Sequence, residues 1–286
     1  MALPSENKKE KLIDKPVLEG LTVPLAIILV GALIIFGVTK MLSSGRDHRD
    51  LIKEMHTTTF GNRWVAAFEL SKLLASNSIP AEEREWVAEN LVQIYYETED
   101  PRTRNFIILA LGTLPTAKSI EAINKAVQDP DEKVKFNAVV ALGNLPVGSF
   151  IDANNLLPLL NSEDKGLAQV VIFTLATHQV KEAEAKIIPL VNSSDRLVRY
   201  SAATALIHYR REEIQKTIQE IMMLNESNTS TGLNGAQVEA LKMNVLSALQ
   251  KNRWGKFEKL LEQVAQEDTN VKISTKAREV LNLLKN

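Results

Sequence analysis

The sequence predicts an all-α solenoid of stacked helical hairpins that follows one transmembrane helix. Two observations predict this fold class: segments of the chain repeat at a constant offset, and a long uncharged apolar stretch lies near the N-terminus. The composition agrees, because aromatic residues make up only 5% of the chain while apolar residues make up 45%. Such a mixture, mostly Leu, Ile, Val and Ala, suits helix-on-helix packing better than a β-sandwich.

Charge and cysteine content exclude several classes of function. The net charge is −1 and the chain has no cysteine. A nearly neutral domain has no positive field for a phosphate backbone, so we expect no nucleic-acid partner. The absence of cysteine excludes disulfides, thiolate catalysis, Fe–S clusters and thiolate-rich zinc sites in this chain.

The apolar stretch is long enough to span a bilayer. Residues 21–38 read LTVPLAIILVGALIIFGV and contain no charge. As a helix they would extend roughly 27 Å, close to the thickness of the hydrocarbon core, and residues 39–42 can lengthen it. We therefore predict a polar tail at 1–20, a transmembrane helix in contact with lipid at 21–42, a juxtamembrane linker or helix at 43–59, and the solenoid at 60–286.

Two other readings of this stretch are weaker, and its orientation is not decided. A cleaved signal peptide would be shorter and would end in small residues, and a buried core helix is rarely apolar all round. Basic residues balance across the stretch, so the positive-inside rule gives no direction; they are Lys8, Lys9, Lys11 and Lys15 before it, and Lys40, Arg46, Arg49 and Lys53 after it. The usual arrangement of an N-terminal signal anchor favours an extracytoplasmic solenoid.

Self-comparison reveals the repeat. Residues 156–162 (LLPLLNS) match residues 187–193 (IIPLVNS), and residues 100–115 (DPRTRNFIILALGTLP) match residues 131–146 (DEKVKFNAVVALGNLP). Both pairs are offset by 31 residues. Two separate pairs at one period indicate duplication of a structural unit.

Each unit has an apolar stretch, a polar turn with Asp, and a second apolar stretch of helical periodicity. In the second stretch apolar residues fall at i, i+4, i+7, i+8 and i+11, which is one stripe of an α-helix. Alanines on the stripe allow helices to approach closely: Ala110, Ala138, Ala141, Ala202, Ala205 and Ala248.

The ends of these second helices also carry signals. Asp100, Asp131 and Asp195 stand where an N-cap acceptor is expected. Gly112 and Gly143, each followed three residues later by proline, mark the expected helix C-terminus.

The pattern D-x-x-V-[RK]-x-x-A-x-x-A-L-G resembles the HEAT repeat, particularly its short bacterial form, also called the phycobilisome-lyase HEAT-like repeat. One unit matches fully, through Asp131, Val134, Lys135, Ala138, Ala141, Leu142 and Gly143; a second matches without the glycine, through Asp195, Val198, Arg199, Ala202, Ala205 and Leu206. The resemblance spans roughly residues 60–285. It implies an armadillo-type superhelix that binds proteins and, with the anchor, a single-pass protein of the bacterial inner membrane; tetratricopeptide and ankyrin signatures are absent.

No pattern of catalytic residues stands out. Phosphate-binding, dinucleotide-binding, nucleophile-elbow and metalloprotease motifs are missing. Some HEAT-repeat enzymes hold metals with His-Glu steps, but none of the four histidines (His48, His56, His178, His208) precedes a glutamate. His178 is expected at a half-buried helix end, and His48 and His56 in solvent. We predict no catalytic, cofactor or metal site.

Residues that could contact a partner are few. The basic concentration Arg196, Arg199, Arg210 and Arg211 could bind an acidic partner. Alternatively it is structural, because the resemblance gives Arg199 the basic position that bridges to an acid of the next repeat. Trp64, Trp86, Trp254 and the Tyr95–Tyr96 pair are either core residues or partner anchors. The polar loop at 225–235 is an insertion whose role the sequence leaves open.

These observations predict a non-catalytic scaffold held at the membrane and engaged with a protein partner. A solenoid exposes much surface per residue, and a tether raises the local concentration of what it binds. Two alternatives stay open: an accessory subunit of a modifying enzyme, as the lyase-associated repeats imply, or a structural component of an envelope complex.

Overall fold

A computed structural model describes residues 46–57, 62–225 and 232–285. His48–Asn286 forms one compact unit. The segment predicted to span the membrane, 21–42, lies outside the described residues, as does most of the loop at 225–235. Among the helices that the structure describes, none has the length and apolar character needed to cross a membrane.

The regular structure of the described residues is entirely helical, as the sequence predicted. The α-helices are α2 (His48–His56), α3 (Arg63–Ala75), α4 (Arg84–Glu97), α5 (Pro101–Leu111), α6 (Ala117–Ala126), α7 (Glu132–Asn144), α8 (Ala153–Leu156), α9 (Lys165–Thr177), α10 (Lys181–Ile187), α11 (Arg196–Leu206), α12 (Gln215–Met222), α13 (Gly235–Asn252), α14 (Glu258–Glu267) and α15 (Val271–Lys285). Short 3-10 turns continue α8 as Leu157–Asn161, α10 as Ile188–Asn192 and α11 as Ile207–Tyr209.

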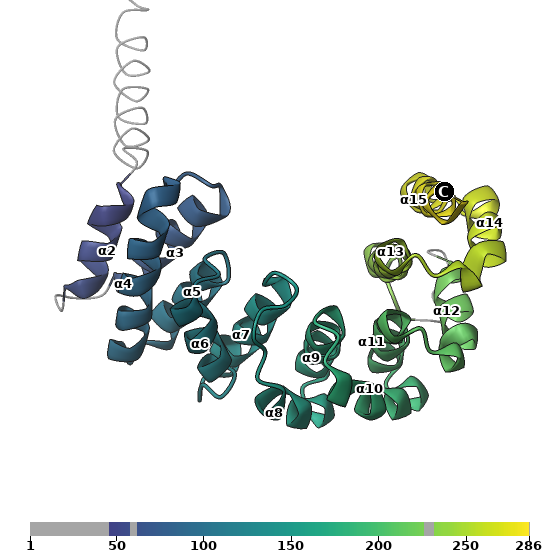
Figure 1. The fold of residues 1–286 in the computed structure, drawn as a ribbon, viewed down its shortest axis with the longest axis horizontal. Helices are drawn as coiled ribbons and strands as arrows, with labels where there is room; N and C mark the ends of the chain where they lie inside the picture. Colours follow the sequence, from purple (N-terminus) through teal and green to yellow (C-terminus); the bar gives the residue numbers. More distant parts are fainter. Residues whose placement is uncertain (1–45, 58–61, 226–231, 286) are drawn as a thin grey trace, which may run out of the picture. The chain divides into compact units, whose positions relative to one another are not determined.

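The helices form two layers. Consecutive odd-numbered helices from α3 to α11 pack against one another, and each odd helix also packs on an even one (Figure 1). The even-numbered helices form the second layer. The first of them, α2, packs on α3 and α4 and buries Leu51, Ile52 and Met55. The predicted juxtamembrane region thus contributes the first helix of the stack.

Alternation of the layers divides the turns between two edges. Successive helices run in opposite directions, so turns from odd to even helices lie at one end of each helix pair and turns from even to odd helices lie at the other. The odd-to-even turns form what we call the first edge; they are residues 76–83, 112–116, 145–152, 178–180, 210–211 and 253–254. Turns from even to odd helices, including 98–100, 127–131, 162–164 and 193–195, form the second edge.

The N-caps lie at the second edge. Asp100, Asp131 and Asp195 accept hydrogen bonds from backbone amides in the first turns of α5, α7 and α11. Asp164 does the same for α9. Each carboxylate satisfies amides that have no partner within the helix, which explains an aspartate at the start of successive odd helices.

The predicted stripe forms the core. Val134, Leu142 and Leu206 are completely buried, and Val198 is 4% exposed. The alanines of the stripe are buried as well. A single apolar cluster runs from α2 to α15, so each hairpin shields the apolar face of its neighbour.

The two repeat glycines lie at the ends of α5 and α7, as predicted, but neither ends its helix through a left-handed conformation. Gly112 has φ −59°, a right-handed conformation, and α7 continues through Gly143. Neither glycine therefore supplies a left-handed C-cap. A Cβ atom on Gly112 would lie 2.9 Å from Cβ of Ala141, and one on Gly143 would lie 2.8 Å from Oγ1 of Thr174. Glycine is needed here because the next odd helix approaches this closely.

We expect Gly143→Ala to lower the free energy of unfolding by about 1–3 kcal/mol, because the added methyl must displace Thr174 from a packed layer. The measurement is urea unfolding of the full chain in mild detergent, followed by circular dichroism. The matched control is Gly255→Ala, where the added methyl meets no atom within 4 Å. Equal effects of the two substitutions would contradict a packing role for Gly143.

Candidate functional site

An aromatic patch lies between α3 and α5. Trp64 and Phe68 are one turn apart on α3, and Phe106 faces them from α5. The Phe106 ring is 5.1 Å from the Phe68 ring and 6.4 Å from the indole of Trp64, with which it stacks. Phe68 is 39% exposed, and the other two rings are half-buried. We call Trp64, Phe68 and Phe106 the aromatic patch.

Two cations flank the aromatic patch. The guanidinium of Arg102 lies 5.6 Å from the Trp64 ring, and the ammonium of Lys72 lies 5.2 Å from the Phe68 ring. Arg102 also contacts the N-cap carboxylate Asp100 at 3.1 Å. Exposed aromatic rings with adjacent cations are the composition found at energetically dominant positions of protein interfaces.

The patch includes one aromatic residue that the sequence singled out and two that it did not. Trp64 was weighed as an anchor or a core plug. Phe68 and Phe106 were missed, although Trp64 and Phe68 have the i, i+4 spacing of neighbours on one helix face. Their approach to Phe106 joins residues about forty positions apart, which no local pattern shows.

The other aromatic candidates are mostly engaged within the fold. Trp86 meets His48 edge-on at 6.3 Å, and Trp254 meets Phe257 edge-on at 5.3 Å. Tyr95 is buried and bonded to a carboxylate. Tyr96 alone of this group is largely exposed, at 52%.

The predicted basic cluster is divided by the structure. Arg196 and Arg199 lie at the N-terminal end of α11 and line one surface hollow, whereas Arg210 and Arg211 follow its C-terminal end. The α11 helix separates the two pairs by roughly 16 Å. The four side chains therefore do not form one site.

Arginines of both pairs contact their own chain. Arg199 donates to the Ser193 carbonyl at 2.9 Å and lies 3.7 Å from Glu220. Arg210 donates to the Asn252 carbonyl at 3.0 Å, and Arg211 pairs with Glu184 and Glu213. Much of the predicted cluster therefore makes contacts that stabilise the fold.

The histidines lie at helix ends or on helix surfaces. Nε2 of the half-buried His178 lies 2.8 Å from the Leu142 carbonyl, so this nitrogen carries the proton and donates. His48 is half-buried against Trp86, which corrects the expectation that it lies in solvent; His56 is exposed. In the part of the chain that the structure describes, no group of three His, Cys, Asp or Glu side chains could hold a metal ion.

Burial, together with the nearby charge of Lys251, lowers the pKa of His208 from 6.5 to about 4. Between these values the unfolded chain binds a proton that the folded chain does not bind. Acid therefore favours unfolding, and stability falls as the pH falls from 6.5 to 4.

We expect His208→Gln to reduce the loss of unfolding free energy between these two pH values by about 2 kcal/mol. The measurement is the free energy of unfolding of the full chain in detergent across this pH range. His56→Gln, at an exposed histidine, serves as the control for the substitution itself. A His208→Gln profile identical to that of wild type would refute the assignment.

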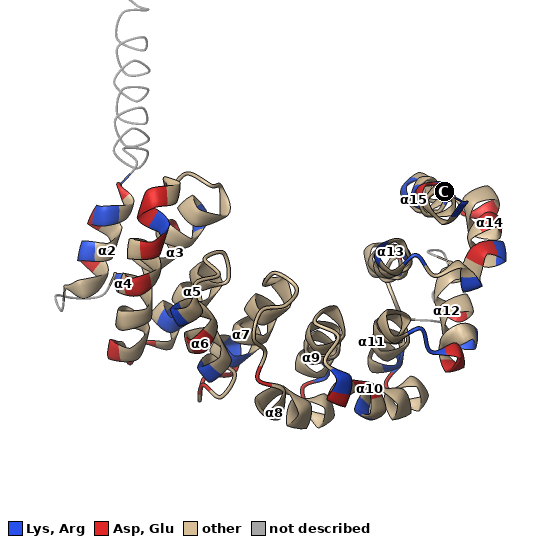
Figure 2. Cartoon of the chain, viewed as in Figure 1, with Lys and Arg blue, Asp and Glu red and all other residues tan. Residues whose placement is uncertain are grey.

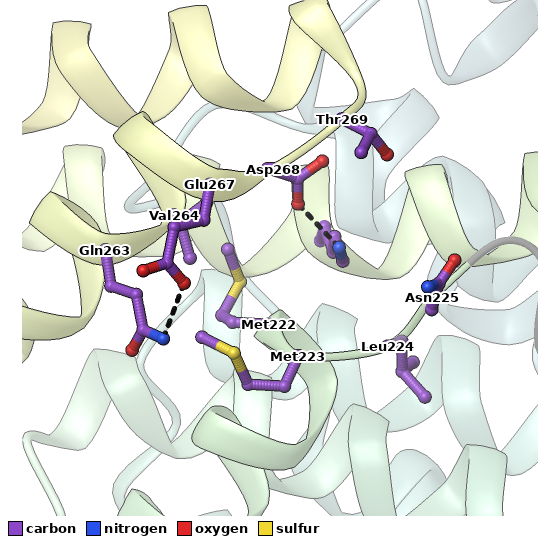
Figure 3. Close-up of a pocket in the computed structure, with 10 residues that line it drawn as sticks. Met222, Met223, Leu224, Asn225, Gln263, Val264, Glu267, Asp268 and Thr269 are labelled. Atoms are coloured by element: carbon purple, nitrogen blue, oxygen red, sulfur yellow. Dashed lines mark hydrogen bonds and ion pairs between the residues drawn. The ribbon is translucent and has the colours of Figure 1, made fainter.

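A small cavity of about 170 Å³ lies between the end of α12, α13 and the turn from α14 to α15 (Figure 3). Met222, Met223 and Val264 contribute apolar walls. Lys242 and Asp268 lie at its inner side and form an ion pair of 2.6 Å, with side chains 8% and 6% exposed. Because each charge has its partner, this pair leaves no unsatisfied group for a ligand.

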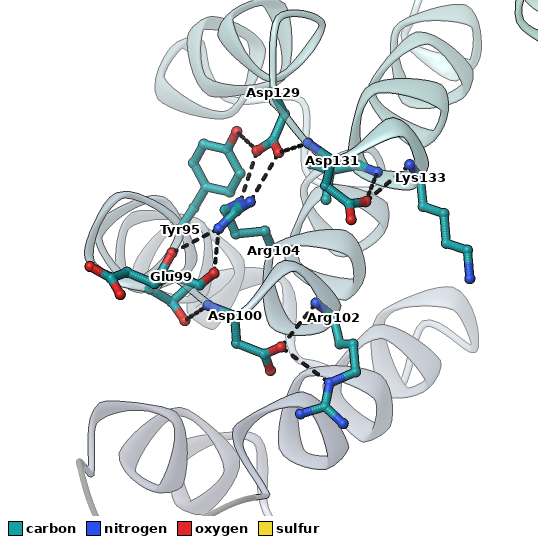
Figure 4. Close-up of polar contacts among 10 residues, drawn as sticks. Tyr95, Glu99, Asp100, Arg102, Arg104, Asp129, Asp131 and Lys133 are labelled. Carbon is teal, nitrogen blue, oxygen red and sulfur yellow. Dashed lines mark hydrogen bonds and ion pairs between the residues drawn. The ribbon is translucent and has the colours of Figure 1, made fainter.

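An ion pair like Lys242–Asp268 also links α5 to the turn between α6 and α7 (Figure 4). Arg104 donates two hydrogen bonds to the carboxylate of Asp129, at 2.9 and 3.0 Å. Tyr95 also donates to Asp129, at 3.0 Å, and the Asp131 amide does so at 2.9 Å. Burial would raise the pKa of Asp129, but these hydrogen bonds hold it below its ordinary value.

Arg104 and Lys242 occupy the basic repeat position that Lys135 and Arg199 also occupy. Only Arg104 and Lys242 reach a buried aspartate in the following turn; Lys135 pairs with Glu132 of its own helix. The sequence singled out the other two because they fit the repeat pattern. Whether the basic side chain at this repeat position is buried depends on whether an aspartate about twenty-five residues later is placed to pair with it.

We expect Asp129→Asn to lower the free energy of unfolding by about 3 kcal/mol, because it leaves the buried Arg104 charge without a carboxylate. Urea unfolding of the full chain in detergent measures it. The control is Glu89→Gln, which removes an exposed pair with Lys118 and should change stability little. A loss no larger than that of the control would show that the buried pair is dispensable.

Charged residues of both signs are interspersed along the described helices in the view of Figure 2.

Comparison with known proteins agrees with this architecture. Residues 88–152 match the family described as HEAT repeats. A chain in the complex of CpcE and CpcF of phycocyanin lyase from Nostoc has 17% identity and a TM-score of 0.56, covering 84% of this chain and 94% of that one. The Escherichia coli protein YibA has 14% identity and a TM-score of 0.53, covering 84% and 83%. A search of curated proteins found no match.

At these identities the likeness to solved structures shows the fold alone. Together with the two-layer stack, it shows an all-α helical repeat solenoid with a fold like that of HEAT and armadillo proteins. The HEAT-repeat resemblance predicted from the sequence is confirmed by the family match over residues 88–152.

Proposed function

We propose that this protein is a membrane-anchored HEAT-repeat scaffold that binds a protein partner and performs no chemistry itself. The observation that carries the proposal is the aromatic patch. The side chain of Phe68 is 39% exposed, and the Phe106 ring contacts both Phe68 and Trp64. Burying such rings against a partner would be favourable, and Lys72 and Arg102 favour a partner segment with carboxylates beside its apolar anchors.

The anchor is the second part of the proposal. The uncharged stretch at 21–38 has the length and composition of a membrane span. Anchoring would confine the solenoid to a surface, where a weakly bound partner is held at high local concentration. We propose a single-pass protein of the bacterial inner membrane with its repeats on the extracytoplasmic side.

A second candidate is an accessory subunit of a modifying enzyme. The supporting observation is the likeness, over 94% of its length, to a chain in the phycocyanin lyase complex. In this case the aromatic patch would bind the catalytic subunit. Deletion of the protein would then abolish one modified product while membrane complexes stay intact.

We expect the full chain, tagged and expressed in its native host, to remain in membranes after an alkaline carbonate wash and to co-purify with a partner in fixed stoichiometry. Phe68→Ser should weaken that association by about tenfold or more, as loss of an interface anchor does. The measurement is recovery of the cross-linked partner from solubilised membranes.

Tyr96→Ser is the matched control, since Tyr96 is an exposed aromatic residue of the even layer. This variant should retain the partner. Loss of the partner with Tyr96→Ser and retention with Phe68→Ser would exclude the aromatic patch as the binding surface. Release of the chain by carbonate would refute the anchor and leave the patch proposal standing.

A further inference from the structure

A groove lies between α8 and α10 in the even layer. It consists of two hollows, of about 500 and 630 Å³, which adjoin because Asn154 and Leu157 line both of them. The first hollow lies beside the turns that lead into the two helices. The second lies beside the 3-10 turns that continue them, where α10 packs on the turn after α8. We call the two hollows together the even-layer groove.

Two prolines shorten the helices that border the groove. Pro158 and Pro189 occupy equivalent positions in the 3-10 turns that continue α8 and α10. A proline has no N–H, so neither residue can donate the helical hydrogen bond to the carbonyl four positions earlier. The α-helices are therefore only 4 and 7 residues long, whereas α4 and α6 of the same layer have 14 and 10. Short helices cover less of the odd layer and leave the groove between them.

The walls of the groove are largely apolar. Leu157, Val180 and Leu190 line it with half-buried side chains. Phe150, in the turn before α8, lines the first hollow with a side chain that is 68% exposed. Covering these side chains with a ligand would remove apolar surface from water, which is favourable.

The core fixes the backbone that carries Phe150. Asn124, which is 5% exposed, donates from Nδ2 to the Phe150 carbonyl at 3.1 Å. Its Oδ1 accepts from the Asp152 amide at 2.8 Å. The exposure of Phe150 is therefore a property of the folded turn, and a ligand would meet a first hollow that is already formed.

The two hollows differ in charge. Asp152 and Glu182 line the first, and Lys186 is the charged residue that lines the second. His178 lines the first hollow as well, with Nε2 directed to the Leu142 carbonyl. The first hollow is therefore complementary to a cation.

We propose that the even-layer groove binds a short segment of a protein partner that carries an arginine beside apolar side chains. The guanidinium enters the first hollow, where Asp152 and Glu182 provide carboxylates and Phe150 provides an aromatic face. A planar guanidinium can pair with a carboxylate and stack on a ring at the same time, which an ammonium does less well. The apolar neighbours of the arginine cover Leu157 and Leu190. The inference depends on neither the aromatic patch nor the membrane anchor.

The test begins with a random library of eight-residue peptides displayed on phage, selected against the full chain immobilised in mild detergent. We expect the enriched peptides to combine arginine with leucine, phenylalanine or similar residues. One of them is then synthesised with a fluorescent label, and its affinity for the full chain is measured by fluorescence anisotropy.

We expect Glu182→Lys to weaken binding of this peptide by about tenfold or more, because it reverses a charge that faces the arginine. Glu163→Lys makes the same change at an exposed residue of the second edge and should leave the affinity unaltered. Phe68→Ser, which alters the aromatic patch, should also leave it unaltered. Circular dichroism verifies that each variant keeps its helical content.

A single introduced thiol reports where the peptide binds, because the chain has no cysteine. Asn154→Cys places the thiol where the two hollows meet, and Ser194→Cys places a control thiol on an exposed turn of the second edge. Saturating peptide should slow the reaction of the first thiol with a maleimide and leave that of the second unchanged.

Three results would overturn the inference. The first is a selection that enriches no peptide, or only acidic ones. The second is a peptide that binds Glu182→Lys as tightly as wild type or leaves the Asn154→Cys thiol unprotected. The third is self-association of the full chain that Phe150→Ser abolishes, since a second copy would then occupy the groove. None of these results bears on the anchor or the aromatic patch.

Discussion

Close approach of consecutive odd helices is the constraint on which the rest of this structure depends. Gly112 lies against Ala141, and Gly143 against Thr174, at distances that leave no room for a Cβ atom. The hydroxyl of Thr174 donates to the Val139 carbonyl at 3.0 Å, so the polar atom at this contact is satisfied. Small residues set the spacing of the layer, and that spacing allows one apolar cluster to continue from hairpin to hairpin.

Polar bonds between repeats then fix how one hairpin is placed on the next. His178 bonds the Leu142 carbonyl, and Tyr209 donates to the Leu175 carbonyl at 3.3 Å, so each satisfies an acceptor near the end of the preceding odd helix. The buried pair Arg104–Asp129 acts at the second edge. Buried ion pairs add little net stability when desolvation is counted, and we attribute to this one the specification of register.

Packing and polar bonds between hairpins leave some side chains at the surface of the stack, and the partly exposed aromatic patch is formed by such side chains. In a solenoid each repeat contacts only its neighbours, so the surface of one hairpin can change without altering the others.

The sequence by itself determined the features that arise within one helix or one hairpin: the period, the stripe from Val134 to Leu142, the N-caps such as Asp131, and the repeat family. Helical periodicity and capping are local, so they are legible in a single chain. The role of Gly143, the burial of Arg104 and the meeting of Phe68 with Phe106 were decided by tertiary structure. Each depends on residues about twenty-five to forty positions apart, brought together only when the hairpins stack. The division of the arginine cluster has the same cause, because proximity in sequence places residues at opposite ends of α11.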